Sequence, residues 1–159
     1  MAELTQIEEK VAEVMGLAQA AQQSTQKVEK LVEDDAVAKT LQQMREEAGE
    51  TEQRCEQVAE RFDGKKTAIQ EKARETKGEA EAMMNDYLKD DVDGLDGLEF
   101  LIMAEAGELG HVEIVGVMSE TTGEQPVREL AEWALPIQQR HFEQIRRAAL
   151  SLAKQEAAG

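Results

Sequence analysis

The chain has 159 residues, of which 33% are charged, 41% are hydrophobic and only 3% are aromatic. This length suits one domain, and the low aromatic content with only two prolines disfavours a β-sandwich and favours long helices, so we expect a single all-α domain over residues 1–159. The formal net charge of −16 at pH 7 excludes nucleic-acid binding and adsorption to anionic membranes, because both need a cationic surface.

The N-terminal segment lacks a basic start followed by an apolar run, so it does not predict a secretory signal. The longest apolar run covers residues 100–104 and is far shorter than the roughly 20 residues of a membrane span. A single cysteine, Cys55, excludes an internal disulfide framework. We therefore expect a cytoplasmic protein without a membrane partner.

Two helices are predicted first, at about residues 3–33 and 36–62, because each has apolar residues at alternating spacings of three and four. The first seam is Leu4, Ile7, Val11, Val14, Ala18, Ala21, Thr25, Val28 and Val32. The second is Val37, Leu41, Met44, Ala48, Thr51, Cys55, Val58 and Phe62. The short connection, with Asp34 or Asp35 as helix cap, predicts that the two helices are antiparallel neighbours. Their seams carry large apolar residues at both ends and small residues in the middle.

Residues 66–85 predict a polar crossover helix that returns along the bundle, followed by a loop at 87–94. A further helix is expected at about 95–118, with Asp93 or Asp96 as its cap. Its apolar residues lie on most sides, including Phe100, Met103 and Ile114, which indicates a helix enclosed by neighbours or by a second subunit. This face favours a homodimer or another protein partner.

The last helix is predicted at about 126–156, with Pro126 at its first position and Pro136 as the site of a kink or a lost hydrogen bond. Its seam includes His141, which we expect to be a hydrogen-bonded or partly exposed core histidine. The sum is four long helices plus a helical crossover between the second and third of them.

A metal-binding pattern appears on the helix at 95–118, where Glu105, Glu108 and His111 share one side. Glu108-x-x-His111 has the form that carboxylate-bridged dimetal bundles direct toward their axis. The last helix has Gln138-x-x-His141 instead, with a neutral amide in place of the carboxylate. Pairing about the turn at 119–125 also places His111 about two helical turns from His141, too far for one dinuclear centre.

Three short segments resemble the ferritin-like stress proteins of the YciE/YciF type. They are Glu-Ala-Gly-Glu-Thr at 47–51, Gly-Lys-Lys at 64–66 and Gly-His-Val-Glu-Ile at 110–114. The resemblance implies a ferritin-like four-helix bundle with a long helical crossover, often dimeric, with dimetal-type carboxylates in its core.

Several positions depart from the pattern of that family. Its motif histidine corresponds to Glu47, its first motif glutamate to Gly110, and the Glu-Glu pair of its last helix to about Ile137 and Gln138. The expected glutamate of the first helix falls near Gln22 or Gln23. The candidate metal residues that remain are Glu47, Glu50, Glu108, His111 and Glu113.

Three functional hypotheses follow. The first is a noncatalytic ferritin-like bundle without a cofactor that acts as a structural or partner-binding protein, with a stress role implied only by the resemblance. The second is a carboxylate-bridged di-iron or di-manganese metalloprotein, serving metal binding or oxidation, that uses the five candidate residues. The third is an acidic coiled-coil adaptor. Cys55, on a helix seam, is expected to be a buried and unreactive thiol.

Overall fold

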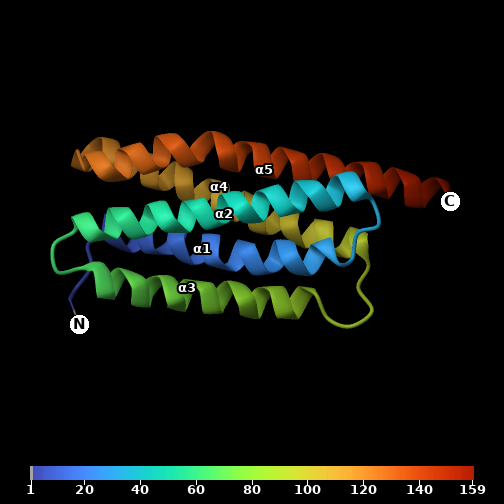
Figure 1. Ribbon diagram of the computed structural model, residues 1–159, viewed down its shortest axis with the longest axis horizontal. Helices are drawn as coiled ribbons and strands as arrows, with labels where there is room; N and C mark the ends of the chain where they lie inside the picture. The colour runs from blue at the N-terminus through green and yellow to red at the C-terminus, as the bar shows by residue number, and fades with distance from the viewer. Residues whose placement is uncertain (1) are drawn as a thin grey trace.

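The computed structural model describes residues 2–159, which form five helices joined by short loops (Figure 1). The helices are α1 (Gln6–Glu29), α2 (Asp35–Arg61), α3 (Lys66–Tyr87), α4 (Gly94–Thr122) and α5 (Gln125–Ala158). Successive helices run in opposite directions along the long axis of the molecule. The described residues contain no strand, which confirms the all-α class, and every helix boundary lies within four residues of its predicted position.

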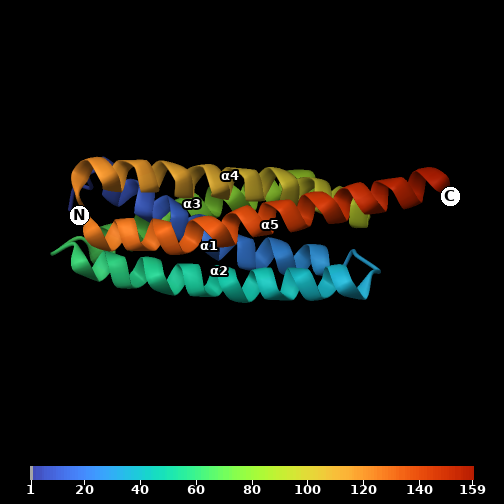
Figure 2. The same cartoon turned by 90° about the horizontal axis from the view of Figure 1, so that it is seen from above.

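Four of the helices surround a common core, and the fifth lies outside them. Helix α1 packs against α2 and α4, and α5 packs against the same two helices, so these four close a ring. Helix α3 packs mainly against α1 and runs back along the bundle (Figures 1 and 2). It is therefore the predicted crossover, and it covers its own bundle. Because α3 spans the bundle, α2 and α4 run in the same direction.

Local capping explains where the helices begin. Thr5 and Glu8 form a capping box at the start of α1, and Asp93 and Asp96 form another at the start of α4. The carboxylate of Asp34 accepts hydrogen bonds from the backbone of Ala36 and Val37 and so starts α2. The predicted aspartate caps are confirmed.

Three helix ends differ most from their predicted positions. Helix α1 starts at Gln6 instead of residue 3, because Thr5 caps it there, and ends at Glu29 instead of residue 33. Helix α4 continues to Thr122, four residues beyond its expected end at 118, and stops where Gly123 adopts the left-handed conformation with φ 72°. Helix α5 runs through Pro136 without interruption, and its C-terminal end extends beyond the other helices in both ribbon views.

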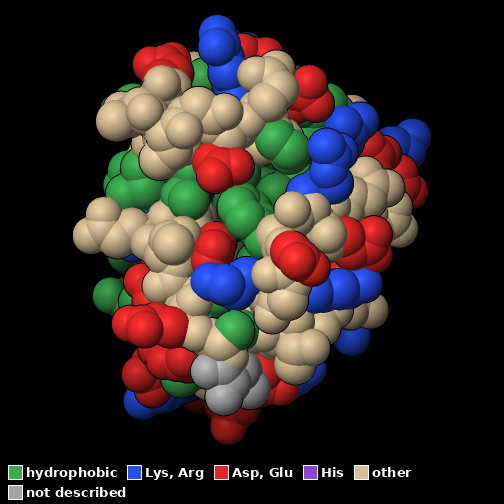
Figure 3. All heavy atoms as spheres, turned by 90° about the vertical axis from the view of Figure 1, so that its left-hand side faces the viewer, with side chains coloured by type: hydrophobic (Ala, Val, Ile, Leu, Met, Phe, Trp, Pro, Cys, Tyr) green, Lys and Arg blue, Asp and Glu red, His purple; other side chains and the backbone are tan. Residues whose placement is uncertain are grey.

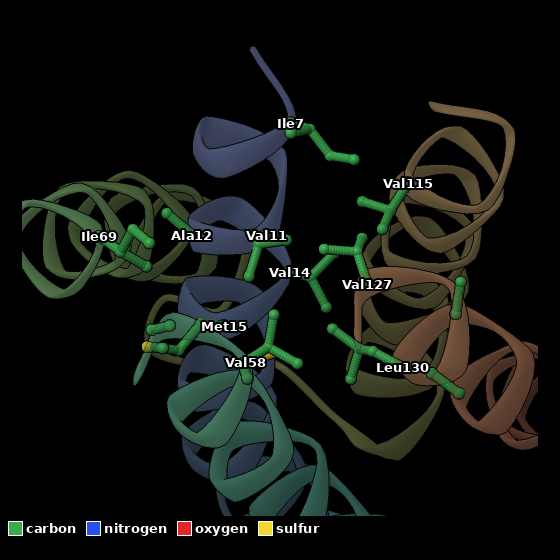
Figure 4. Packing of buried hydrophobic residues seen from close by; sticks show 14 of the residues in the cluster. Ile7, Val11, Ala12, Val14, Met15, Val58, Ile69, Val115, Val127 and Leu130 are labelled. Atoms are coloured by element: carbon green, nitrogen blue, oxygen red, sulfur yellow. The ribbon is translucent and has the colours of Figure 1, made fainter. Parts of the chain in front are cut away.

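The hydrophobic core is divided into two clusters. One lies near the α2–α3 loop and contains Val11, Met15 and Ile69, with α1 between α3 on one side and α4 and α5 on the other (Figure 4). The other lies near the α1–α2 turn and contains Leu41 and Leu101. Small and polar residues separate the two clusters, as predicted from the small seam residues in the middle of the first two helices.

The apolar third bundle helix, α4, is only partly enclosed. Phe100 is buried, and its ring lies 6.0 Å from that of Tyr87, so at this residue the helix is enclosed by its own neighbours, which is one of the two predicted alternatives. The crossover helix and the loop after it supply the neighbours that cover this ring. Met103, Ile114 and Val117 remain 43%, 44% and 64% exposed on the same helix.

The surface is charged with both signs. At the end of the molecule that carries the α2–α3 loop, basic and acidic side chains surround a few apolar ones (Figure 3). No helix among residues 2–159 combines the length and apolarity required to cross a membrane.

Gly16 sets the distance between α1 and α3. A Cβ at this position would lie 2.4 Å from the backbone oxygen of Ala73 and 2.8 Å from the Cβ of Thr76. We therefore expect Gly16→Ala to lower the free energy of unfolding by about 1–3 kcal/mol in urea denaturation, because α3 must move away.

Gly107 is the matched control, since a Cβ there would meet no atom within 4 Å. Gly107→Ala should raise the free energy of unfolding by roughly 0.5–1 kcal/mol through helix propensity alone. Equal effects of the two substitutions would contradict the close contact at Gly16.

Candidate functional site

A group of ionisable and amide side chains lies in the middle of the bundle, between the two hydrophobic clusters. We call it the central polar layer, and it consists of Glu47, Glu105, Glu108, Gln138, Arg140 and His141. Glu105 and His141 are only 1% and 2% exposed. The polar atoms of these residues must therefore find partners within the protein.

Helix geometry places these side chains at one level. Glu105 and Glu108 are three residues apart on α4, and Gln138 and His141 are three residues apart on α5, so each pair shares a helix face. Small residues on the first two helices, Ala18, Ala21, Ala48 and Thr51, are buried in the same part of the bundle. Their short side chains leave room for the longer polar ones.

Glu47 binds two cationic or potentially cationic side chains. Arg140 donates hydrogen bonds from both terminal nitrogens to the two carboxylate oxygens, one of them at 2.8 Å. The Nε2 atom of His141 lies 3.0 Å from Oε1 of Glu47. An ionised carboxylate can only accept, so Nε2 carries the proton in this contact. The hydrogen bonds from Arg140 hold the pKa of Glu47 below its usual value, despite the opposing effect of burial.

Glu105 and Glu108 form a carboxyl pair deeper in the layer. The amide nitrogen of Gln138 donates to Oε2 of Glu105 at 3.2 Å, and Nδ1 of His141 lies 3.9 Å from the same oxygen. Burial raises the pKa of both carboxyl groups, and repulsion from Glu105 raises that of Glu108 further. Glu108 therefore releases its proton at a higher pH than an ordinary glutamate.

The structure separates the five residues that the sequence selected as metal candidates. Glu47 and Glu108 belong to the central polar layer, whereas Glu50 and Glu113 are exposed. His111 is half-buried, with Nδ1 2.8 Å from the carbonyl oxygen of Gly107 and Nε2 3.4 Å from a carboxylate oxygen of Glu13. Within residues 2–159, no group of three or more His, Cys, Asp or Glu side chains is arranged to hold a metal ion.

Two other sequence-based expectations are confirmed. His141 is a buried and hydrogen-bonded core histidine, and it has different partners from His111. Cys55 is completely buried, and burial raises the pKa of its thiol far above the usual value. The thiol is therefore unreactive at neutral pH.

Arg140 is the residue of the layer that the sequence pattern did not select. It directly precedes His141, at the edge of the α5 seam, where a long side chain can reach inward while its end remains near water. Its side chain is 37% exposed, although it binds Glu47. The sequence signal that could have identified Arg140 was its position beside a histidine on the helix seam, in a chain rich in acidic residues.

Comparison with the models of known protein families, with curated proteins and with solved structures gives no match.

The protonated state of Glu108 predicts how stability depends on pH. Between 4.5, the usual value for glutamate, and the raised pKa, the folded protein holds a proton that the unfolded chain has released. The wild-type protein therefore loses stability as pH rises through this window. Glu108→Gln keeps a donor for Glu105 but cannot ionise. We expect its stability relative to wild type to increase by roughly 1–3 kcal/mol between pH 5 and pH 8 in urea denaturation.

Glu113→Gln is the control for this experiment, because Glu113 lies on the same helix and is exposed. Its stability should follow that of wild type across the pH range. A Glu108→Gln variant that also follows wild type would contradict a buried carboxyl that keeps its proton.

Proposed function

We propose that this protein is a noncatalytic helical bundle of the ferritin-like type that acts as a structural or partner-binding protein. In this proposal its own side chains occupy the place of a dimetal centre. The observation that carries it is the pairing of both oxygens of Glu47 with the guanidinium of Arg140. A carboxylate whose lone pairs are engaged in this way is not available to a metal ion.

The protein's own groups stabilise the carboxyl groups of the central polar layer without a bound cation. Arg140 neutralises Glu47, and the raised pKa of Glu108 disfavours the ionised form of one of the two deeper carboxyl groups. Gln138 donates to Glu105, which His141 also approaches. Buried charges that are paired or protonated need no further counter-ion.

The residues at the expected metal-ligand positions also favour a bundle without a dimetal centre. A dimetal bundle uses a glutamate from each of two helices and a Glu-x-x-His pair from each of the other two. On α1, Gln22 is near the position of the expected glutamate, and its amide binds Glu52 and the carbonyl of Ala18. On α5, Gln138 replaces the glutamate of the Glu-x-x-His pair.

A di-iron or di-manganese protein is the second candidate function. It is favoured by the meeting of three carboxyl groups and one imidazole at one level of the bundle, from Glu47, Glu105, Glu108 and His141. A divalent cation that displaced the proton of Glu108 would need Arg140 to leave Glu47. The further alternative, an acidic coiled-coil adaptor, has no comparable use for a polar layer shared by three helices.

The partner-binding part of the proposal is supported by α4. Met103 and Ile114 leave nearly half of their side-chain surface in water, and Val117 leaves more. Large apolar side chains gathered on one helix are typical of surfaces that bind another protein or a second copy. A role in stress is part of the proposal only through the sequence resemblance.

Metal content separates the two functions. Protein purified from cells grown with added iron and manganese should contain well under one equivalent of either metal per chain, measured by mass spectrometry of the digested protein. Glu47→Ala should leave this background unchanged, as should Glu113→Ala, its exposed control. Two equivalents per chain that are lost in Glu47→Ala and kept in Glu113→Ala would overturn the proposal and establish the metalloprotein.

A further inference from the structure

An apolar groove of about 390 Å³ lies between α1, α3 and α4. It is separate from the Arg140 side of the central polar layer, although Glu108 forms part of its lining. Its apolar walls come from Leu17 and Ala20 on α1, Met83 and Met84 on α3, and Phe100 and Met103 on α4. The groove exists because α3 contacts α1 closely at Gly16 but leaves a space beside α4 further along.

The groove leaves large apolar side chains in contact with water. Met83 is 55% exposed and Met103 is 43% exposed, on opposite walls. Methionine side chains are flexible and polarizable, so such a surface adapts to varied apolar side chains of a partner.

The length of the groove matches the side of a short helix. Its lining on α4 extends from Phe100 to His111, which is roughly 16 Å at the rise of an α-helix. About three turns of a helix fit this length, which is sufficient for apolar side chains at positions i, i+4 and i+7.

The charges around the groove are mostly negative. Glu13, Glu79 and Glu81 contribute to its lining, and the whole chain has a net charge of −16. Glu13 lies 2.8 Å from Lys10 and Glu81 lies 3.5 Å from Lys77, and Lys72, the lysine of the lining, is also paired with a carboxylate. Among the described residues Glu79 has no ion-pair partner, so the rim keeps a net negative charge that is complementary to lysine and arginine side chains.

We propose that this groove binds a basic amphipathic helix of a partner protein, with its apolar side in the groove and its cationic side chains on the acidic rim. The proposal rests on the partner-binding part of the proposed function and names the chemistry of that partner. A second copy of this chain is disfavoured as the occupant, because two chains of charge −16 repel each other.

The test uses a synthetic amphipathic helix of leucine and lysine, about four turns long, titrated into the full chain and followed by calorimetry. We expect one peptide to bind per chain, with an affinity that falls as salt is added. A peptide of the same composition in scrambled order, and a leucine–glutamate peptide with the same apolar pattern, should each bind at least about tenfold more weakly.

Matched variants locate the site. The pair Met83→Gln and Met103→Gln should weaken binding of the leucine–lysine peptide about tenfold, because both side chains line the groove. Leu150→Gln removes exposed apolar surface on α5, outside the groove, and should change affinity less than about twofold. Circular dichroism of the double variant and of the control checks that the helices are retained.

Removal of negative charge from the rim tests whether electrostatic attraction contributes to binding of the leucine–lysine peptide. Glu79→Gln with Glu81→Gln should weaken binding about threefold or more, whereas Glu129→Gln with Glu132→Gln, on α5, should not. Equal binding of the scrambled or acidic peptide would overturn the proposal. So would an equal loss of affinity in the methionine double variant and in Leu150→Gln, or a homodimer in light scattering that Met83→Gln and Met103→Gln dissociate. None of these results would alter the metal content, so the noncatalytic bundle is tested separately.

Discussion

The neutralisation of carboxyl groups inside the bundle is the constraint on which the middle of this structure depends. An ionised carboxylate that is buried without a partner costs several kcal/mol, a large part of the roughly 5–15 kcal/mol by which folded proteins are stable. The protein reduces this cost in two ways. Glu47 is paired with Arg140 and His141, and burial raises the pKa of Glu108. The contact of Glu47 with Arg140 joins α2 to α5, and that of Glu105 with Gln138 joins α4 to α5, so the layer also helps to align these three helices.

The two hydrophobic clusters follow from this arrangement. Long polar side chains need space, and the small residues Ala18, Ala21 and Ala48 provide it where the layer crosses the bundle. Larger apolar residues then fill the bundle on both sides, around Met15 at one end and Leu101 at the other. The apolar clusters supply most of the stability, and the layer between them supplies specificity of alignment.

The crossover helix connects the layer to the surface. Close contact at Gly16 holds one part of α3 against α1, and Met84 and Leu88 anchor its other end in the second cluster. Between these points α3 does not close on α4, and the apolar groove results. Glu108 lines the groove and also belongs to the central polar layer. A ligand in the groove would therefore lie next to a residue of the layer.

The sequence alone determined the helical class, the order of the five helices and most of their caps, because apolar spacing and capping residues act over a few neighbouring positions. It also determined that Cys55 would be buried, since this residue lies on an apolar seam, whereas burial of His141 was decided by the tertiary structure. Helix α4 showed the limit of this reasoning, because its uniform apolarity did not reveal that Phe100 packs inside the molecule while Met103 remains open to solvent. Gly123, which ends α4, is a local signal that the predicted end at residue 118 did not use.

Only the tertiary structure decided which polar residues meet. Glu50 and Glu113 belong to short motifs that suggested a metal site, yet both face solvent, because the rotation of a helix about its axis is set by packing against its neighbours. Arg140 reaches Glu47 across a separation of 93 residues, and no local pattern encodes that contact. The protonation of Glu108 likewise depends on burial and on the proximity of Glu105, which exist only after the helices have assembled.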